Sequence, residues 1–446
     1  MKYEKKDVYS NLTDKQKNEM NEYMEGYIDF LNNSKTEYKA IENIVDILNK
    51  NGFVDILTCK NIKAKDKVYF VNKDKSIYAA IIGSDDILNG INLIGSHVDS
   101  PRIDLKPIPL YENQGVCLLK TQYYGGIKKY QWVTTPLSMI GVVYNKNNEK
   151  INIEIGEDKN DPCFTITDIL PHLANDQLKL KASEFIDPEK MSITFGSYKD
   201  KDSIKDNILK LLNEKYGIDE IDFARSEIEF VPCNKARFVG IDKSMIGGYG
   251  QDDRVCVYAS LKAFLSNKNT NKTNILMIVD KEEIGSVGNT SMATSTFDMF
   301  IKKIINKDVD INEVYYNSKM LSADVSAGVD PNYDEVSDIQ NSNMLGCGVC
   351  IEKYTGSGGK FNASDANAKY ISYIMNKFDN KNVKYQIGTL GKVDKGGGGT
   401  ICYILANKGI DVIDVGTPVI SMHSPFEITS VTDVYMTYLA YIAFME

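Results

Sequence analysis

Apolar positions near the start of the chain recur at intervals of three and four, which is the spacing of one face of an α-helix. This pattern predicts a helix over residues 13–33. A second helix is expected to open at the segment from Ser34 to Glu37, whose order of hydroxyl and carboxylate matches a capping box, and to stop at Asn51 and Gly52. Neither helix carries candidate chemistry, so both are expected to be structural.

Short, continuous apolar runs predict buried strands elsewhere in the chain. Four such runs lie at about 77–82, 91–95, 275–279 and 412–415. Because these runs alternate with helical patterns, the sequence predicts an α/β fold with a mixed, largely parallel sheet flanked by helices. Ligands gather at the carboxyl ends of strands in open α/β sheets, so the loops that follow these runs are the first places to look for a site.

The middle of the chain has a different pattern. Residues 106–246 contain β-branched and alternating runs with one helical segment, at about 203–216. We therefore expect a β-rich domain inserted into an α/β catalytic domain, which would consist of residues 1–105 and 247–446.

Composition narrows the class of protein. The chain has 446 residues, a formal charge of −9 and no stripe of Lys and Arg with interleaved aromatics, so nucleic acid is not an expected partner. No apolar run approaches the roughly 20 residues that span a bilayer, and the first residues lack the apolar segment of a signal peptide. The eight cysteines do not suggest a disulfide framework, and we expect a cytoplasmic protein with no membrane partner.

One pair of cysteines allows three interpretations. Cys347 and Cys350 form a lone C-x-x-C, which could be half of a zinc site or a redox pair. The favoured interpretation is that both are small residues in a buried strand.

Histidine is scarce, so its placement is informative. Two of the three histidines lie in polar loops of small residues, one near each end of the chain, and acidic segments lie between them. Two imidazoles and three carboxylates from separate segments are what a pair of hydrolytic metal ions requires. The candidate ligands are His97, His423 and one carboxylate from each of the segments that contain Asp252, the pair Glu282 and Glu283, and Asp324.

The neighbours of these residues suggest further roles, each with a simpler alternative. Asp99 can accept the second N–H of His97, although His97 could also be an ordinary loop histidine. Adjacent carboxylates point apart, so one of Glu282 and Glu283 can bind metal while the other acts as general base; the alternative is a solvated charge pair. Asp252 precedes a helical pattern and could simply cap that helix.

A glycine-rich segment, Lys395 to Thr400, does not match the phosphate-binding Walker motif. Its glycines, Gly398 among them, either let the backbone approach a substrate or form a flexible turn.

These segments, in this order, resemble the aspartyl aminopeptidase family of two-metal exopeptidases over nearly the whole chain. The resemblance is carried by Ser96–Arg102, Tyr124–Gly126, Asp280–Ser286, Ser322–Asp324, Asp330–Tyr333 and Met422–Pro425. It implies a sheet of the zinc exopeptidase type and two divalent metal ions per subunit, with zinc expected and manganese or cobalt as alternatives. It also implies peptide substrates.

The resemblance further implies a role for each residue. His97 and Asp324 would hold one metal, Glu283 and His423 the other, and Asp252 would bridge them. Glu282 would be the general base, and Asp99 would orient His97.

The same resemblance implies an assembly. The inserted domain would mediate dimerisation, and dimers would form a closed tetrahedral dodecamer. His172 would then reach the active site of a neighbouring subunit; the alternative is a structural loop histidine.

Members with acidic substrates carry a lysine where this chain has Glu352, although Lys353 follows directly. We therefore expect N-terminal residues that are neutral or basic to be cleaved faster than Asp or Glu. The residues assigned to substrate binding are His172, Glu352 and Gly398.

The sequence thus predicts a metal-dependent aminopeptidase in which activated water attacks the N-terminal peptide bond. The alternatives are a deacylase or carboxypeptidase on the same scaffold, and a metal-stabilised assembly without catalysis. Glu282 separates the last of these from the others, because a scaffold needs ligands but no base.

Overall fold

The computed structural model describes residues 2–199, 203–267, 271–305, 309–395 and 397–446. The chain forms two compact units. The first comprises Met1–Asp99, Ala236–Met422 and Glu427–Glu446, and the second comprises Ser100–Lys235 and His423–Phe426. The sequence placed the changes of domain at 105/106 and 246/247. The two units instead change at 99/100 and 235/236, because β5 (Arg102–Asn113) pairs in the sheet of the second unit, whereas β12 (Arg237–Val239) and β13 (Met245–Gly248) pair in a sheet of the first unit.

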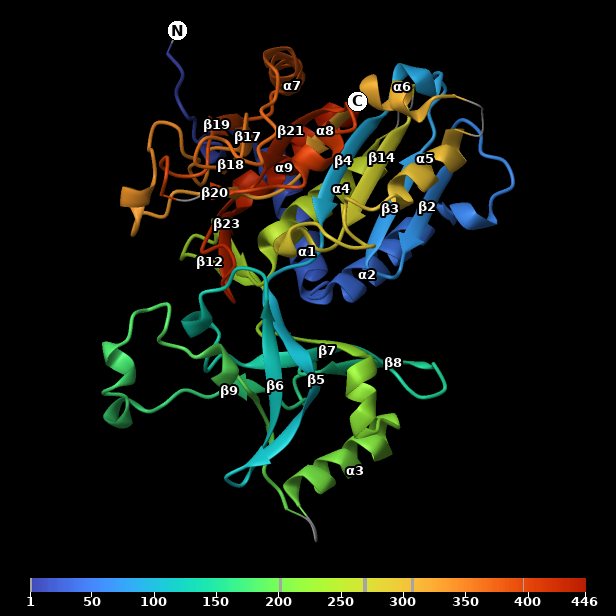
Figure 1. The fold of residues 1–446 in the computed structure, drawn as a ribbon. Helices are drawn as coiled ribbons and strands as arrows, with labels where there is room; N and C mark the ends of the chain where they lie inside the picture. The colour runs from blue at the N-terminus through green and yellow to red at the C-terminus, as the bar shows by residue number, and fades with distance from the viewer. Residues whose placement is uncertain (1, 200–202, 268–270, 306–308, 396) are drawn as a thin grey trace. The chain divides into compact units, whose positions relative to one another are not determined.

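The first unit is built on a nine-stranded mixed sheet (Figure 1). Its four central strands run parallel, and the α/β fold with a largely parallel sheet is confirmed. In order across the sheet, the strands are β1 (Val54–Asp55), β2 (Lys67–Asn72), β3 (Ser76–Ile81), β14 (Asn274–Val279), β4 (Asn92–His97), β15 (Lys319–Ser322), β21 (Asp411–Gly416), β17 (Val349–Glu352) and β19 (Tyr385–Gly388).

Helices bury both faces of this sheet, which explains why its strands read as continuous apolar runs. In β14, Leu276 and Ile278 join one hydrophobic core while Ile275, Met277 and Val279 join the other. One core is completed by α1 (Asp14–Asn33), α2 (Glu37–Lys50), α4 (Gln251–Ser266), α7 (Ala368–Asn380) and α9 (Val431–Met445). The opposite core is completed by α5 (Thr296–Ile305), α6 (Ile311–Tyr316) and α8 (Cys402–Ala406).

The first two helices show how far the local pattern reaches. The helix predicted over 13–33 is confirmed, and Thr13 forms a capping box with Gln16. The second helix starts later than predicted, with Thr36 rather than Ser34 as its N-cap. Glu37 does not return to cap Ser34 because its carboxylate is buried against the Lys75 ammonium, 2.9 Å away.

Two smaller sheets complete the first unit. The order β12-β13-β23-β22-β16 adds β23 (Glu427–Ser430), β22 (Pro418–Ile420) and β16 (Ser326–Ala327) to the hairpin already described. A short antiparallel pair joins β18 (Gly356–Ser357) to β20 (Gly397–Gly398).

In its described residues, the second unit is a seven-stranded antiparallel sheet with one α-helix, α3 (Ile204–Tyr216), packed on β5 and β6. The helix predicted at about 203–216 is confirmed. In order across the sheet, the strands are β8 (Lys150–Ile155), β7 (Leu137–Tyr144), β11 (Ser226–Pro232), β5 (Arg102–Asn113), β6 (Val116–Tyr124), β10 (Ile193–Gly196) and β9 (Thr165–Ile166). No helix among the described residues of either unit has the length and apolarity needed to cross a bilayer.

Candidate metal centre

The candidate site lies at the carboxyl ends of three adjacent parallel strands of the first unit, β14, β4 and β15. Figure 1 labels two of them, β4 and β14, side by side. Strand β4 ends at His97, β14 ends three residues before Glu282, and β15 ends two residues before Asp324. Parallel strands present their carboxyl ends at the same edge, so these three positions lie at one edge of the sheet, and their roles at a metal site stay a prediction.

His97 is buried among carboxylates. Its Nε2 lies 3.3 Å from Asp252 Oδ1 and 3.5 Å from Asp324 Oδ1. Burial lowers the pKa of His97, but hydrogen bonds to surrounding carboxylates outweigh it and raise the pKa well above the usual value. Its Nδ1 lies 3.0 Å from the backbone oxygen of Asp99. A proton held on Nδ1 by that carbonyl leaves Nε2 as the nitrogen able to bind a cation.

Asp252 lies close to both His97 and Glu283. It approaches His97 as just described, and its carboxylate also lies within 4.8 Å of the Glu283 carboxylate. Helix capping does not explain this residue, because Gly250 is the N-cap of α4 and the backbone of Asp252 is not helical. Its N–H donates to Glu427 Oε2 over 3.1 Å. Asp252 therefore has the position that a bridging ligand requires.

Asp253 is a member of the site that the sequence analysis missed. Its carboxylate groups with His97 and Asp324, with one ligand atom from each within 4.8 Å of the others. Its Oδ2 accepts the backbone N–H of His97 over 3.2 Å, and burial raises its pKa well above the usual value. The available signal was the doublet of Asp252 and Asp253 ahead of an apolar helix.

Asp99 connects His97 to the loop that carries both glutamates. Its Oδ1 lies 3.4 Å from His97 Nδ1, and the role of Asp99 in orienting that ring stays a prediction. Its two carboxylate oxygens also accept the backbone N–H groups of Glu282 and Glu283, each over 3.1 Å. One buried carboxylate thus fixes the imidazole and the glutamate loop relative to each other.

The electrostatics of the cluster fit a bound cation. Burial raises the pKa of Glu282 to about 8, with nearby carboxylates adding to the shift. Burial also raises the pKa of Asp324, and the Asp252 carboxylate raises it further. Buried, mutually repelling carboxylates are stabilised by divalent cations, and imidazole nitrogen with carboxylate oxygen is a donor set that Zn²⁺ accepts. The residues present therefore fit zinc.

His423 belongs to the second unit, together with the three residues after it. Its Nδ1 lies 2.9 Å from the backbone oxygen of Gly126. A carbonyl at this distance holds the proton on Nδ1, so Nε2 is again the nitrogen suited to a metal. This arrangement of the ring parallels that of His97, and ligation by His423 stays a prediction.

The three residues assigned to substrate binding have different settings. His172 is exposed in a short 3-10 helix, Pro171–Leu173. Gly398 lies in β20, paired with Gly356 of β18. Glu352 is buried in β17 and accepts a hydrogen bond from Asn343 Nδ2 over 3.0 Å, whereas Lys353 is exposed. Their contact with substrate stays a prediction.

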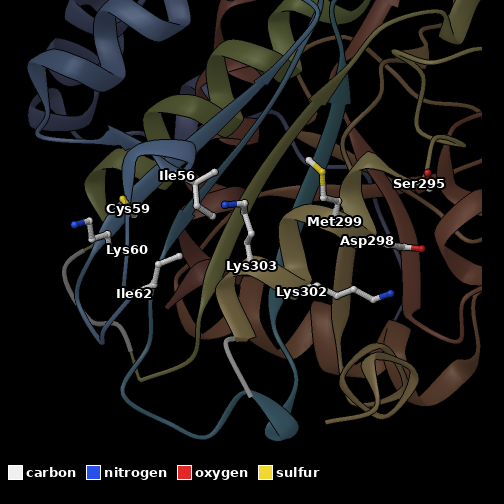
Figure 2. Close-up of a pocket in the computed structure, with 9 residues that line it drawn as sticks. All are labelled: Ile56, Cys59, Lys60, Ile62, Ser295, Asp298, Met299, Lys302 and Lys303. Carbon is white, nitrogen blue, oxygen red and sulfur yellow. The ribbon is translucent and has the colours of Figure 1, made fainter. Parts of the chain in front are cut away.

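Two other features lie apart from this chemistry. Cys350 is buried in β17, Cys347 is half-buried, and both are free thiols. A hollow of about 600 Å³ lies beside α5, lined by lysines and apolar side chains such as Lys302, Lys303 and Ile56 (Figure 2). None of its lining residues is a candidate metal ligand, so it is not the catalytic centre.

Comparison with known proteins gives the family. The sequence pattern of the family described as "Aminopeptidase I zinc metalloprotease (M18)" matches residues 30–445. A probable M18 family aminopeptidase 1 from Borrelia garinii subsp. bavariensis is 46% identical over 455 residues, covering 99% of each chain. The chain belongs to the M18 family. It is therefore a metalloprotease of the aminopeptidase type, as the resemblance implied.

Solved structures of other proteins agree with the fold. An M18 family aminopeptidase from Thermotoga maritima is 41% identical, covers 100% of each chain and superposes with a TM-score of 0.96. A structure from S. cerevisiae described as an mApe1 dodecamer is 21% identical, covers 96% of this chain and 97% of that chain, and has a TM-score of 0.77. The first neighbour confirms the zinc exopeptidase type of fold for this M18 chain.

Proposed function

We propose that this M18 aminopeptidase holds two zinc ions per subunit. His97 and Asp324 would bind one ion, Glu283 and His423 the other, and Asp252 would be shared. The observation that carries the proposal is the position of Asp252, whose carboxylate approaches both His97 Nε2 and Glu283. Asp253 supports the first ion by holding the backbone of His97. Manganese and cobalt, which accept the same donors, are the alternatives.

The chain's own residues supply the proton transfers. When bound, the metal pair supplies Lewis-acid polarisation of the peptide carbonyl and lowers the pKa of water. Glu282 accepts the proton from the attacking water and delivers it to the nitrogen of the departing peptide. Asp99 keeps Glu282 in place through its backbone N–H. The free α-amine of the substrate would be bound by the acidic groups of the cluster, which limits cleavage to the first residue.

This arrangement favours hydrolysis over a structural role for the metals. A metal-stabilised assembly needs ligands alone, whereas Glu282 is a further carboxylate held beside them by Asp99. A deacylase would instead recognise the N-acyl group of its substrate, and a carboxypeptidase would recognise the C-terminal end. A panel of aminoacyl, N-acyl and C-terminal substrates, assayed with Zn²⁺, Mn²⁺ and Co²⁺, tests this proposal and identifies the metal.

For specificity, we propose a preference against acidic N-terminal residues. Glu352 of β17 is paired in register with Asp414 of β21, and Asp414 in turn pairs with Ser322, two residues before Asp324. Burial, with Asp414 adding to it, raises the pKa of Glu352 to about 8, and the pKa of Asp414 rises to about 6. Between about pH 6 and pH 8, Asp414 is ionised while Glu352 holds its proton, so this buried pair carries about one negative charge, which disfavours a second carboxylate nearby.

The expected result is a kcat/KM at least on the order of tenfold higher for peptides starting with Leu or Lys than for those starting with Asp or Glu, equivalent to about 1.4 kcal/mol. Glu352→Gln removes little charge near pH 7, so it should change this ratio by less than about threefold. The measurement is kcat/KM for the four peptides with both proteins. A preference for Asp or Glu in the unaltered enzyme would refute the proposal.

We also propose a cytoplasmic homo-oligomer, a tetrahedral dodecamer in which the second unit mediates dimerisation and His172 serves a neighbouring subunit. Support comes from the segment around His172, where Leu170, Leu173 and Leu178 are exposed, and from the dodecamer described for the yeast relative. None of the eight cysteines, all of which lie among the described residues, forms a disulfide, which is usual in a reducing compartment.

Light scattering should give about 600 kDa, twelve times the 50.0 kDa chain. Leu173→Asp should dissociate the assembly and lower activity, because a charge opposes burial of that segment. Leu57→Asp, an exposed leucine of the first unit, is the matched control and should leave the mass unchanged. A stable, fully active monomer would refute both the assembly and the role of His172 in trans.

A further inference from the structure

The loop that carries Glu282 and Glu283 contains a backbone conformation that few side chains adopt. Lys281, the residue before the pair, has φ of +69° and lies in the left-handed region. Its backbone oxygen accepts the N–H of Ser286 over 2.7 Å, which closes the loop on itself. This conformation lets the two N–H groups that follow point at Asp99.

The Lys281 side chain is tied down within the same loop. Its Nζ donates to Asp280 Oδ2 over 3.1 Å and to Thr290 Oγ1 over 2.9 Å. The Thr290 hydroxyl donates to the same Asp280 oxygen over 2.6 Å. Asp280 and Thr290 are 1% and 2% exposed, so the lysine head closes a nearly buried triangle of polar groups.

Gly288 provides the space that the lysine stem occupies. A Cβ at this glycine would lie 3.2 Å from Lys281 Cδ and 3.3 Å from Cε, closer than ordinary contact. The stem of Lys281 thus lies across Gly288, and the loop from residue 280 to residue 290 is closed by one side chain as well as by backbone hydrogen bonds.

We propose that Lys281 is a positioning residue that holds this loop in one conformation, so that Glu282 faces the substrate and Glu283 faces the metal. The proposal rests on the function assigned above to the two glutamates. In this proposal Lys281 contacts neither the substrate nor the metal. Its side chain acts by fixing the backbone whose N–H groups donate to Asp99. Without the contacts of the Lys281 side chain, the loop samples other conformations, and the carboxylates of Glu282 and Glu283 lose their defined directions.

Amide hydrogen exchange of the zinc-loaded enzyme tests whether Lys281 holds the loop in one conformation, without reference to activity. In Lys281→Met, which keeps the stem and removes the ammonium, the amides of Glu282 and Glu283 should exchange faster by on the order of tenfold or more. Thr290→Val should act in the same direction through the hydroxyl alone. Lys73→Met is the matched control, because Lys73 is an exposed lysine with a similar left-handed φ of +54°.

Kinetics tests the consequence for catalysis. In Lys281→Met, kcat should fall by about 10- to 100-fold while KM stays within about threefold, since misplaced catalytic groups slow the chemical step more than binding. Lys281→Arg keeps a cation, so its kcat should be closer to that of the unaltered enzyme than the kcat of Lys281→Met is. Lys281→Gly adopts the backbone conformation without strain but lacks the ammonium, so it should be impaired like Lys281→Met.

Three results would overturn the proposal: unchanged amide exchange in Lys281→Met, unchanged kcat in that variant, or full activity in Lys281→Gly. Failure of the underlying function has a different signature. There, Glu282→Gln would stay active while Lys281→Met still lost amide protection.

Discussion

Replacing Glu282 by Gln should lower kcat by about 10²- to 10⁴-fold, which is the usual contribution of general acid–base catalysis. The amide has nearly the shape of the carboxylate but cannot accept the proton of the attacking water. The backbone N–H of residue 282 should still donate to Asp99, so the loop and the metal ligands keep their places. Zinc content should therefore be unchanged while turnover is lost.

The measurement is kcat together with zinc per subunit on the same preparation. Glu313→Gln, an exposed glutamate of α6, is the matched control and should behave as the unaltered enzyme does. Near-normal turnover in Glu282→Gln would exclude Glu282 as the base. Loss of zinc in that variant would instead make Glu282 a ligand.

Replacing Asp252 by Asn should remove metal and activity together. The carboxylate lies between His97 and Glu283, so losing its charge weakens both proposed ions at once. The expected result is at most one zinc per subunit after dialysis and a fall in kcat of at least about 10²-fold, of the size seen when groups that stabilise developing charge are lost. Added zinc should restore part of the activity by mass action.

The measurement is a chelator titration of zinc alongside activity over a range of zinc concentrations. Asp46→Asn, an exposed aspartate of α2, is the control. Two tightly held zinc ions in Asp252→Asn would refute the bridging role, whatever the activity. Activity lost with zinc retained would point to a catalytic role for Asp252 instead.

The sequence by itself determined the architecture of the first unit and the place of the site. Strands such as β14 are buried on both faces, so nearly every position is apolar and the run is visible without a structure. Parallel strands share an edge, and the residues that follow β4, β14 and β15 therefore had to meet there. The segments were specific enough to imply the family, which the comparisons confirm.

The tertiary structure alone decided which polar groups pair within the site. No sequence pattern predicted that Asp99 also binds two N–H groups more than 180 residues away, or that Asp253 holds the backbone of His97. The start of α2 was misplaced for the same reason, because the partner of Glu37 is Lys75 from another segment. Periodicity reports which face of an element is buried. It does not report which distant donor a buried carboxylate meets, because that depends on how separate elements pack.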